Sequence, residues 1–147
     1  MAPPDSVPRD WRALIPHQGS MCLIDEILAW DGETIHARTR SHARKDNPLL
    51  SDGRLRAVHL CEYGAQAMAV HGGLVARASG NAAAPGFLVA LRAVELFVER
   101  FDDLPEALDV RAEKLLGDDN GWQYAFRIEH ARALLAAGRA AVLLARR

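Results

Sequence analysis

The stretch from residue 55 to residue 77, LRAVHLCEYGAQAMAVHGGLVAR, decides the fold of this chain. Its apolar residues recur at intervals of three and four, which is the period of an α-helix with a buried face. Many of the residues between them are glycine or alanine, which allow neighbouring elements to approach closely. The pattern predicts one buried helix from about Leu55 to Arg77, ending at Ser79-Gly80 because glycine commonly terminates helices.

Two segments before this helix are typical of a β-hairpin. Residues 21–30 form a compact apolar run, and residues 34–40 alternate between apolar and polar, as a half-buried strand does. Asp31-Gly32 between them is a strong turn signal. Residues 41–56 then lose all periodicity, so a long loop is predicted there.

The residues after the helix are typical of strands. Residues 86–101 are almost continuously apolar, so this strand is expected to be buried on both faces for part of its length. Residues 108–116 and 122–130 alternate on either side of a turn signal at 118–121. The segment 134–144 is ambiguous between helix and strand, and we interpret it as one more strand. This order predicts an α+β fold in which an antiparallel sheet wraps around one helix.

Composition restricts the classes of protein. The chain has 147 residues, which favours a single domain over residues 1–147, with the proline-rich residues 1–9 as a flexible lead-in. Its 18 basic and 19 acidic residues give a net charge of −1, which supplies no field to attract nucleic acid or an anionic membrane. Only Cys22 and Cys61 are present, so a disulfide framework and a cysteine-based zinc site are excluded. Without a membrane-span pattern or a secretory signal, a soluble cytoplasmic protein is expected.

Three motifs follow one another along the first half of the chain. They are IPHQGSMCLIDEI at residues 15–27, NPLLSDGRL at 47–55 and EYGAQA at 62–67. In this order they resemble the motifs of hot-dog-fold β-hydroxyacyl-acyl-carrier-protein dehydratases, and most closely those of the aryl-polyene-cluster type. The resemblance implies a hot-dog fold, a long central helix wrapped by an antiparallel sheet.

The resemblance also implies an activity. A dehydratase of this kind converts a 3-hydroxyacyl thioester on an acyl carrier protein to a trans-2-enoyl thioester, in fatty-acid- or polyene-type biosynthesis. It uses no metal or redox cofactor, since the substrate is carried on phosphopantetheine. This sequence departs from the classical family at residues 53–56, where Arg54 stands in place of the catalytic loop histidine. Two alternatives therefore stay open: an acyl thioesterase of the same fold, and a non-catalytic hot-dog subunit that binds acyl chains or a catalytic partner.

Dehydration needs a base for the α-proton, an acid for the departing hydroxyl, and donors for the enolate oxygen. Glu62 matches the family's helix glutamate and is the candidate acid; the alternative is a carboxylate that simply favours a helix N-terminus. His17, in the first motif, is the leading candidate base, against a structural role at the entry to the first strand. His59 shares a helical face with Glu62 and is either a base or a local ion-pair partner.

Other residues are candidate substrate-binding groups. Backbone N–H groups at the helix start, from Leu55 to Val58, are expected to hold the oxyanion. Gln66 either orients the candidate acid or is a buried amide bonded to the opposing strand. Arg54 and Arg56 are expected to meet the phosphate of phosphopantetheine or acidic groups of an acyl carrier protein, the alternative being solvated loop residues. The expected partners are an acyl carrier protein and a second hot-dog subunit, identical in a homodimer or different, which removes the open sheet edge.

Overall fold

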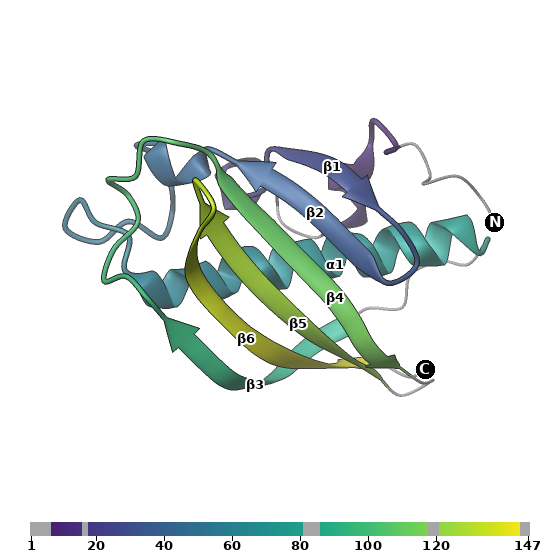
Figure 1. The fold of residues 1–147 in the computed structure, drawn as a ribbon. Helices are drawn as coiled ribbons and strands as arrows, with labels where there is room; N and C mark the ends of the chain where they lie inside the picture. The colour runs from purple at the N-terminus through teal and green to yellow at the C-terminus, as the bar shows by residue number, and fades with distance from the viewer. Residues whose placement is uncertain (1–6, 16–17, 81–85, 118–120, 145–147) are drawn as a thin grey trace.

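One long helix is wrapped by six antiparallel strands in the structure of this protein (Figure 1), a computed structural model that describes residues 7–15, 18–80, 86–117 and 121–144. The sheet has the order β1-β2-β4-β5-β6-β3, and every neighbouring pair is antiparallel. The predicted α+β architecture is therefore confirmed. The elements are α1 (Leu60–Ala78), β1 (Glu26–Trp30), β2 (Thr34–Thr39), β3 (Gly86–Leu96), β4 (Leu108–Gly117), β5 (Gly121–His130) and β6 (Ala133–Leu144).

The predicted hairpin is β1 and β2. The carboxylate of Asp31 accepts hydrogen bonds from the backbone N–H groups of Glu33 at 2.8 Å and Thr34 at 2.7 Å, which fixes the turn. The first strand begins at Glu26, later than the apolar run suggests. The reason is that the backbone of Leu23 is bonded to side chains and not to the backbone of β2: its N–H donates to Gln66 of α1, and its carbonyl accepts the hydroxyl groups of Thr39 and Ser41.

The strand β3 lies at one edge of the sheet. Among the described strands it pairs only with β6, and its side chains from Leu91 to Leu96 are exposed. For residues 91–96 the expected burial on both faces is therefore wrong in the single chain, because no described segment covers the open side of this strand. A bulge between Arg92 and Glu95 interrupts the pairing, and Ala93 within it has a φ of 51°.

The helix packs closely on the inner face of the sheet. A Cβ atom added to Gly64 would lie 2.7 Å from the Cδ2 atom of Phe126, so a glycine is required at this contact. His71 is fully buried and joins three elements. Its Nε2 donates to the carbonyl of Asp31 at 2.8 Å, which leaves Nδ1 to accept the hydroxyl proton of Tyr124 at 2.8 Å. These contacts fix the helix relative to β5 and the first hairpin.

The helix begins at Leu60, so the predicted start at Leu55 is wrong. A 3₁₀ turn, η4 (Ala57–His59), precedes it, and the chain before that turn is extended. The carbonyl of Leu55 accepts a bond from the N–H of Phe101 at 3.0 Å, and the first residue of η4 donates to the carbonyl of Glu99 at 3.0 Å. This pairing with a distant segment holds the chain out of the helix. Within the described residues, no helix has the length and apolar character to span a membrane.

Candidate active site

Glu62 lies in the first turn of α1 and is the only carboxylate of that helix. Its side chain is half-buried. The same helical face continues through Ala65, Ala69, Gly72 and Ala76, all of which are small and none of which is fully buried. A carboxylate therefore stands at the N-terminal end of an apolar helix face that the sheet does not cover.

Gln66 lies one turn further along α1 and is fully buried. Its Oε1 accepts a hydrogen bond from the N–H of Leu23 at 2.8 Å, and its Nε2 donates to the carbonyl of Met21 at 2.7 Å. Both ends of the amide are used, as in the second of the two roles considered for this residue, but the bonded segment is the chain before β1 and not an opposing strand. The bonds fasten α1 to the chain that leads into β1.

His17 lies outside the described residues. The chain that follows it forms a 3₁₀ turn, η2 (Gly19–Met21), which ends at the carbonyl bonded to Gln66. Gln66 and Glu62 are four residues apart and share a helical face. The segment that follows His17 is therefore held against the side of α1 from which Glu62 projects.

His59 occupies the N-cap position of α1, at the end of η4. Its side chain is half-buried, and its backbone N–H donates to the carbonyl of Arg56 at 3.0 Å. It precedes Glu62 by three residues, so both side chains belong to the helix start. No side-chain cap bond from His59 stabilises that start.

Some of the backbone N–H groups predicted to hold an oxyanion already form hydrogen bonds within the chain. The N–H of Leu55 donates to Asp102 at 2.8 Å, and that of Ala57 donates to the carbonyl of Glu99. The side chain of Leu55 has no exposed surface, whereas that of Val58 is 57% exposed. Leu55 is therefore unavailable to a substrate, and Val58 is the residue of this segment that faces solvent.

Asp102 anchors the helix start, and the sequence analysis missed it. Its carboxylate accepts the N–H of Leu55 and is bonded to the guanidinium of Arg100. The bond from Arg100 lowers the pKa of Asp102 to about 2, against the opposing effect of partial burial and with help from the N–H of Leu55. No local signal identifies this role, because the bonded N–H is 47 residues away in the sequence.

Arg54 and Arg56 are exposed beside the helix start. The backbones of Ser51 and Arg54 exchange two hydrogen bonds of 3.0 Å around Asp52 and Gly53, whose φ angles are 54° and 71°. Positive φ at both central residues is the type I′ turn that Asp-Gly favours. Neither arginine forms an ion pair with a described residue, so both guanidinium groups are open to an anionic ligand.

Cys61, next to Glu62, is 8% exposed. Burial raises the pKa of its thiol, and the charge of Glu62 raises it further. The thiol therefore stays protonated and is unsuited to nucleophilic chemistry.

Comparisons with known proteins find a family model and solved structures that are similar to this chain. A family model described as ApeP-like, ApeP dehydratase, matches residues 9–146 of this chain. No curated protein sequence matches it.

Many solved structures share the fold. The dehydratase heterocomplex ApeI:P from Xenorhabdus doucetiae superposes with a TM-score of 0.84 at 24% identity, over 97% of this chain and 94% of that chain. A hypothetical thioesterase from Streptococcus pneumoniae, solved with coenzyme A, gives 0.61 at 10% identity over 82% and 84%. A thioesterase from Haemophilus influenzae gives 0.60 at 12% identity over 82% and 77%. At these identities the likeness concerns the fold alone, and it confirms the predicted hot-dog fold.

Proposed function

This chain belongs to the ApeP-like family of dehydratases, and from that premise we propose that it dehydrates a 3-hydroxyacyl thioester carried by an acyl carrier protein. The product is the trans-2-enoyl thioester, in polyene-type biosynthesis. In the reaction a base removes a proton from the carbon next to the thioester carbonyl, and the hydroxyl leaves with a second proton as water. The observation that carries the proposal is Glu62, the one carboxylate on an open apolar helix face.

Glu62 is the proposed acid. It stands where an acyl chain lying along the small residues of α1 would place its reacting carbons near the helix N-terminus. The helix N-terminus also supplies partial positive charge for the developing enolate.

The proposed base is a histidine, because imidazole accepts a proton near neutral pH. What supports His17 is connectivity: Gln66 holds the segment that follows it against the helix face of Glu62. What supports His59 is its position at the N-cap of the same helix. His17 is the first choice, since it leaves Glu62 and the base on two different segments that can flank a substrate.

A second hot-dog subunit is the proposed partner. The open edge of β3 carries Leu91, Val94, Leu96 and Phe97, whose side chains are 37% to 53% exposed. The open face of α1 is apolar as well, and Glu62 lines neither of the two hollows described for the single chain. Pairing through β3 would extend the sheet, cover the helix face and create the space for the acyl chain. The similar ApeI:P structure is itself a heterocomplex.

Arg54 and Arg56 are the proposed contacts for the acyl carrier protein or for the phosphate of its phosphopantetheine arm. Both are exposed beside the helix that carries Glu62. Guanidinium groups bind phosphate and carboxylate in a bidentate manner, which suits either target. The two cysteines are free thiols, and this suits a cytoplasmic location.

The test is incubation of the purified assembly with a 3-hydroxyacyl acyl carrier protein, followed by intact mass measurement. The wild type is expected to remove one water from the carrier-bound acyl group. Glu62→Gln and His17→Ala are expected to abolish the loss, while the matched control His130→Ala, on β5, retains it. If His17→Ala is active and His59→Ala is inactive, the base is His59.

Two outcomes contradict the proposal. Release of a free acid that depends on Glu62 would make the protein a thioesterase, in which the carboxylate activates water. An unchanged mass with tight binding of the acyl carrier protein or of the partner would make it a binding subunit. A coupled measurement of enoyl absorbance separates slow dehydration from none.

A further inference from the structure

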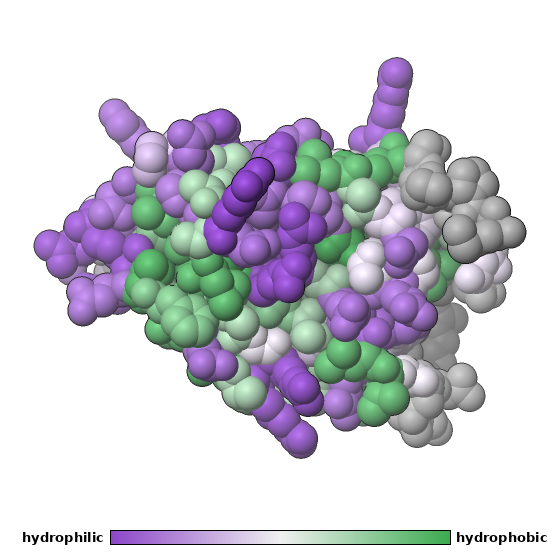
Figure 2. Space-filling model, in the orientation of Figure 1, coloured by the Kyte–Doolittle hydropathy of each residue, from purple (hydrophilic) through white to green (hydrophobic). Residues whose placement is uncertain are grey.

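A hollow of about 710 Å³ lies on the outer face of the sheet, away from α1. Its floor is alanine, from Ala29, Ala125 and Ala137, and its walls come from longer side chains on β2, β4, β5 and β6. The floor and wall residues alternate along the strands with buried core residues, which places them on the face opposite the helix. Figure 2 views this face and shows strongly hydrophilic side chains standing beside paler, weakly hydrophobic surface over the middle of the sheet.

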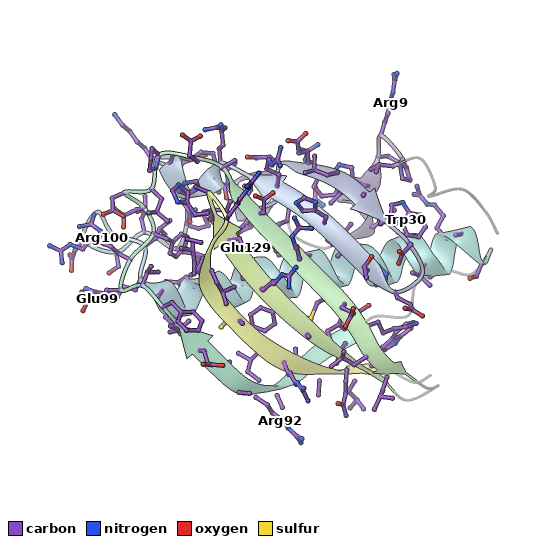
Figure 3. All side chains as sticks on the ribbon, viewed as in Figure 1. Arg9, Trp30, Arg92, Glu99, Arg100 and Glu129 are labelled. Atoms are coloured by element: carbon purple, nitrogen blue, oxygen red, sulfur yellow. The ribbon has the colours of Figure 1, made fainter. Side chains whose placement is uncertain are left out.

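Two pairs of arginines face each other across neighbouring strands of this face. Arg111 pairs in register with Arg127, and Arg139 pairs with Arg92, which projects from the lower edge in Figure 3. Like charges directly opposite each other destabilise a sheet. The first pair shares one carboxylate: Glu129 Oε1 lies 2.9 Å from Nε of Arg111 and 3.7 Å from Nε of Arg127. Among the described residues, Arg139 and Arg92 have no ion-pair partner.

Among the described residues, no ion pair joins the two carboxylates that line the hollow to these arginines. Glu95 and Glu113 line it, and each lies opposite an alanine on the next strand. His36 also lines it and is bonded through Nε2 to Asp109 at 2.7 Å. Because the Glu129 contacts use the Nε atoms, the terminal amino groups of Arg111 and Arg127 keep their hydrogen-bonding capacity.

We infer that this hollow is a second ligand site, which takes a small organic anion, a carboxylate or a phosphate. Its charged group meets Arg111, Arg127 and Arg139, and its apolar body lies on the alanine floor. The volume is in the usual range of small-molecule sites, and three arginines and two carboxylates are among the residues that line it. Ala93, at the rim, is held at a φ of 51°, and such strain in a residue other than glycine is often retained at ligand sites.

The experiment is isothermal titration calorimetry of the full chain with salicylate, an aromatic carboxylate, and with phenyl phosphate. Saturable binding of at least one probe is expected, and the stronger probe identifies the anionic group. Arg111→Gln and Arg139→Gln should each weaken binding about tenfold or more, through the loss of a charge-assisted hydrogen bond. Ala125→Leu should weaken it by filling the floor while keeping every charge.

Two controls make the result specific. Arg9→Gln removes an arginine that projects from the opposite edge in Figure 3 and should leave binding unchanged. Glu62→Gln should also leave probe binding unchanged, so the test of this site does not depend on the proposed dehydration. The inference is overturned if neither probe binds saturably, or if the three hollow variants bind like the wild type. It is equally overturned if those variants weaken only the binding of an acyl carrier protein, which would make the face a protein-docking surface.

Discussion

The carboxylate of Asp102 accepts a hydrogen bond from the backbone N–H of Leu55 at 2.8 Å, across 47 residues of sequence. The bond helps to keep Leu55 in an extended conformation and so delays the start of α1 to Leu60. Glu62 lies in the first turn of that helix. The position of the proposed acid therefore depends on a carboxylate that takes no part in the reaction.

Replacing Asp102 is expected to weaken the fold and the site together. Asp102→Ala leaves the buried N–H of Leu55 without an acceptor, which costs about 1–3 kcal/mol in the free energy of unfolding. Urea unfolding measures this loss, and the dehydration rate should fall as the helix start shifts. Asp103→Ala is the matched control, because its carboxylate lies 3.9 Å from Arg100 and is largely exposed.

The carboxylate of Asp102 also makes the free energy of unfolding depend on pH in the acid range. The pKa of Asp102 falls from 3.8 in a model compound to about 2 in the folded chain. The folded state therefore binds its proton less readily than the unfolded state, so this stabilisation is present above about pH 4 and is lost as the pH falls toward 2. The pH dependence of unfolding should flatten in this range in Asp102→Ala and stay unchanged in Asp103→Ala.

Two glycines of α1 provide a second test. An alanine at Gly64 would place its Cβ 2.7 Å from Phe126, whereas an alanine at Gly72 meets nothing within 4 Å. Gly64→Ala should lower the free energy of unfolding by about 1–3 kcal/mol through overpacking. Gly72→Ala should raise it by up to about 1 kcal/mol, because alanine is the better helix former. Thermal unfolding of the two variants compares them directly.

The Gly64 effect should depend on its neighbour. Adding Phe126→Leu to Gly64→Ala removes part of the ring and is expected to restore some of the lost stability relative to the sum of the single changes. Equal effects of the two glycine variants would contradict close packing between α1 and β5.

The elements that the sequence predicts correctly are those specified by neighbouring residues. The hairpin follows from Asp31-Gly32 between two patterned segments, and the end of α1 follows from Gly80, whose φ is 76°. The strand at 134–144 follows the meander before it, and it is found as β6 (Ala133–Leu144). Glu62 is identified from its motif and found in the first turn of the helix.

The features that the sequence does not predict depend on contacts between distant segments. The late start of α1 needs residues 99–102, and the structural use of Gln66 needs the chain before β1. The apolar run of β3 indicates burial, yet strand order places it at an edge of the single chain. The composition of β3 agrees with a surface that another subunit covers. The periodicity of a single chain does not distinguish such an interface strand from a core strand.

Stability should also depend on pH near neutrality, through two buried histidines. Burial lowers the pKa of both His71 and His42 below the usual histidine value of 6.5. The charges of Lys114 and His130 add to this effect at His71 and His42 respectively, while hydrogen bonds to the carbonyls of Asp31 and Leu104 oppose it. Unfolding therefore takes up protons below about pH 6.5, and the free energy of unfolding falls as the pH falls.

His71→Asn and His42→Asn should each flatten this pH dependence, and the double variant should flatten it most. The measurement is the midpoint of thermal unfolding at a series of pH values from about 6.5 down to the range in which carboxylates begin to take up protons. The slope is the readout, since each variant also loses packing at every pH. A slope unchanged in the double variant would show that these histidines titrate alike in the folded and unfolded chains.

We expect association with a second subunit to be sensitive to substitutions at the open edge of β3. Phe97, just beyond β3, has a side chain that is 53% exposed in the single chain, while its N–H donates to the carbonyl of Leu135 at 2.8 Å. Phe97→Glu keeps that backbone bond and adds a charge to a surface proposed to contact the second subunit. The loss of one buried aromatic side chain is expected to weaken association about 10- to 100-fold. Sedimentation velocity of the assembly as it purifies measures the change.

Leu116→Glu is the matched control, because Leu116 is 66% exposed near the far end of β4. It introduces the same charge on a larger exposed apolar surface, away from the edge of β3. If both variants dissociate the assembly equally, exposure alone governs association and the β3 edge has no special role. If Phe97→Glu dissociates the assembly and dehydration is lost with it, Glu62 works only when the second subunit covers its face of α1. If dehydration survives dissociation, a single chain suffices for the reaction.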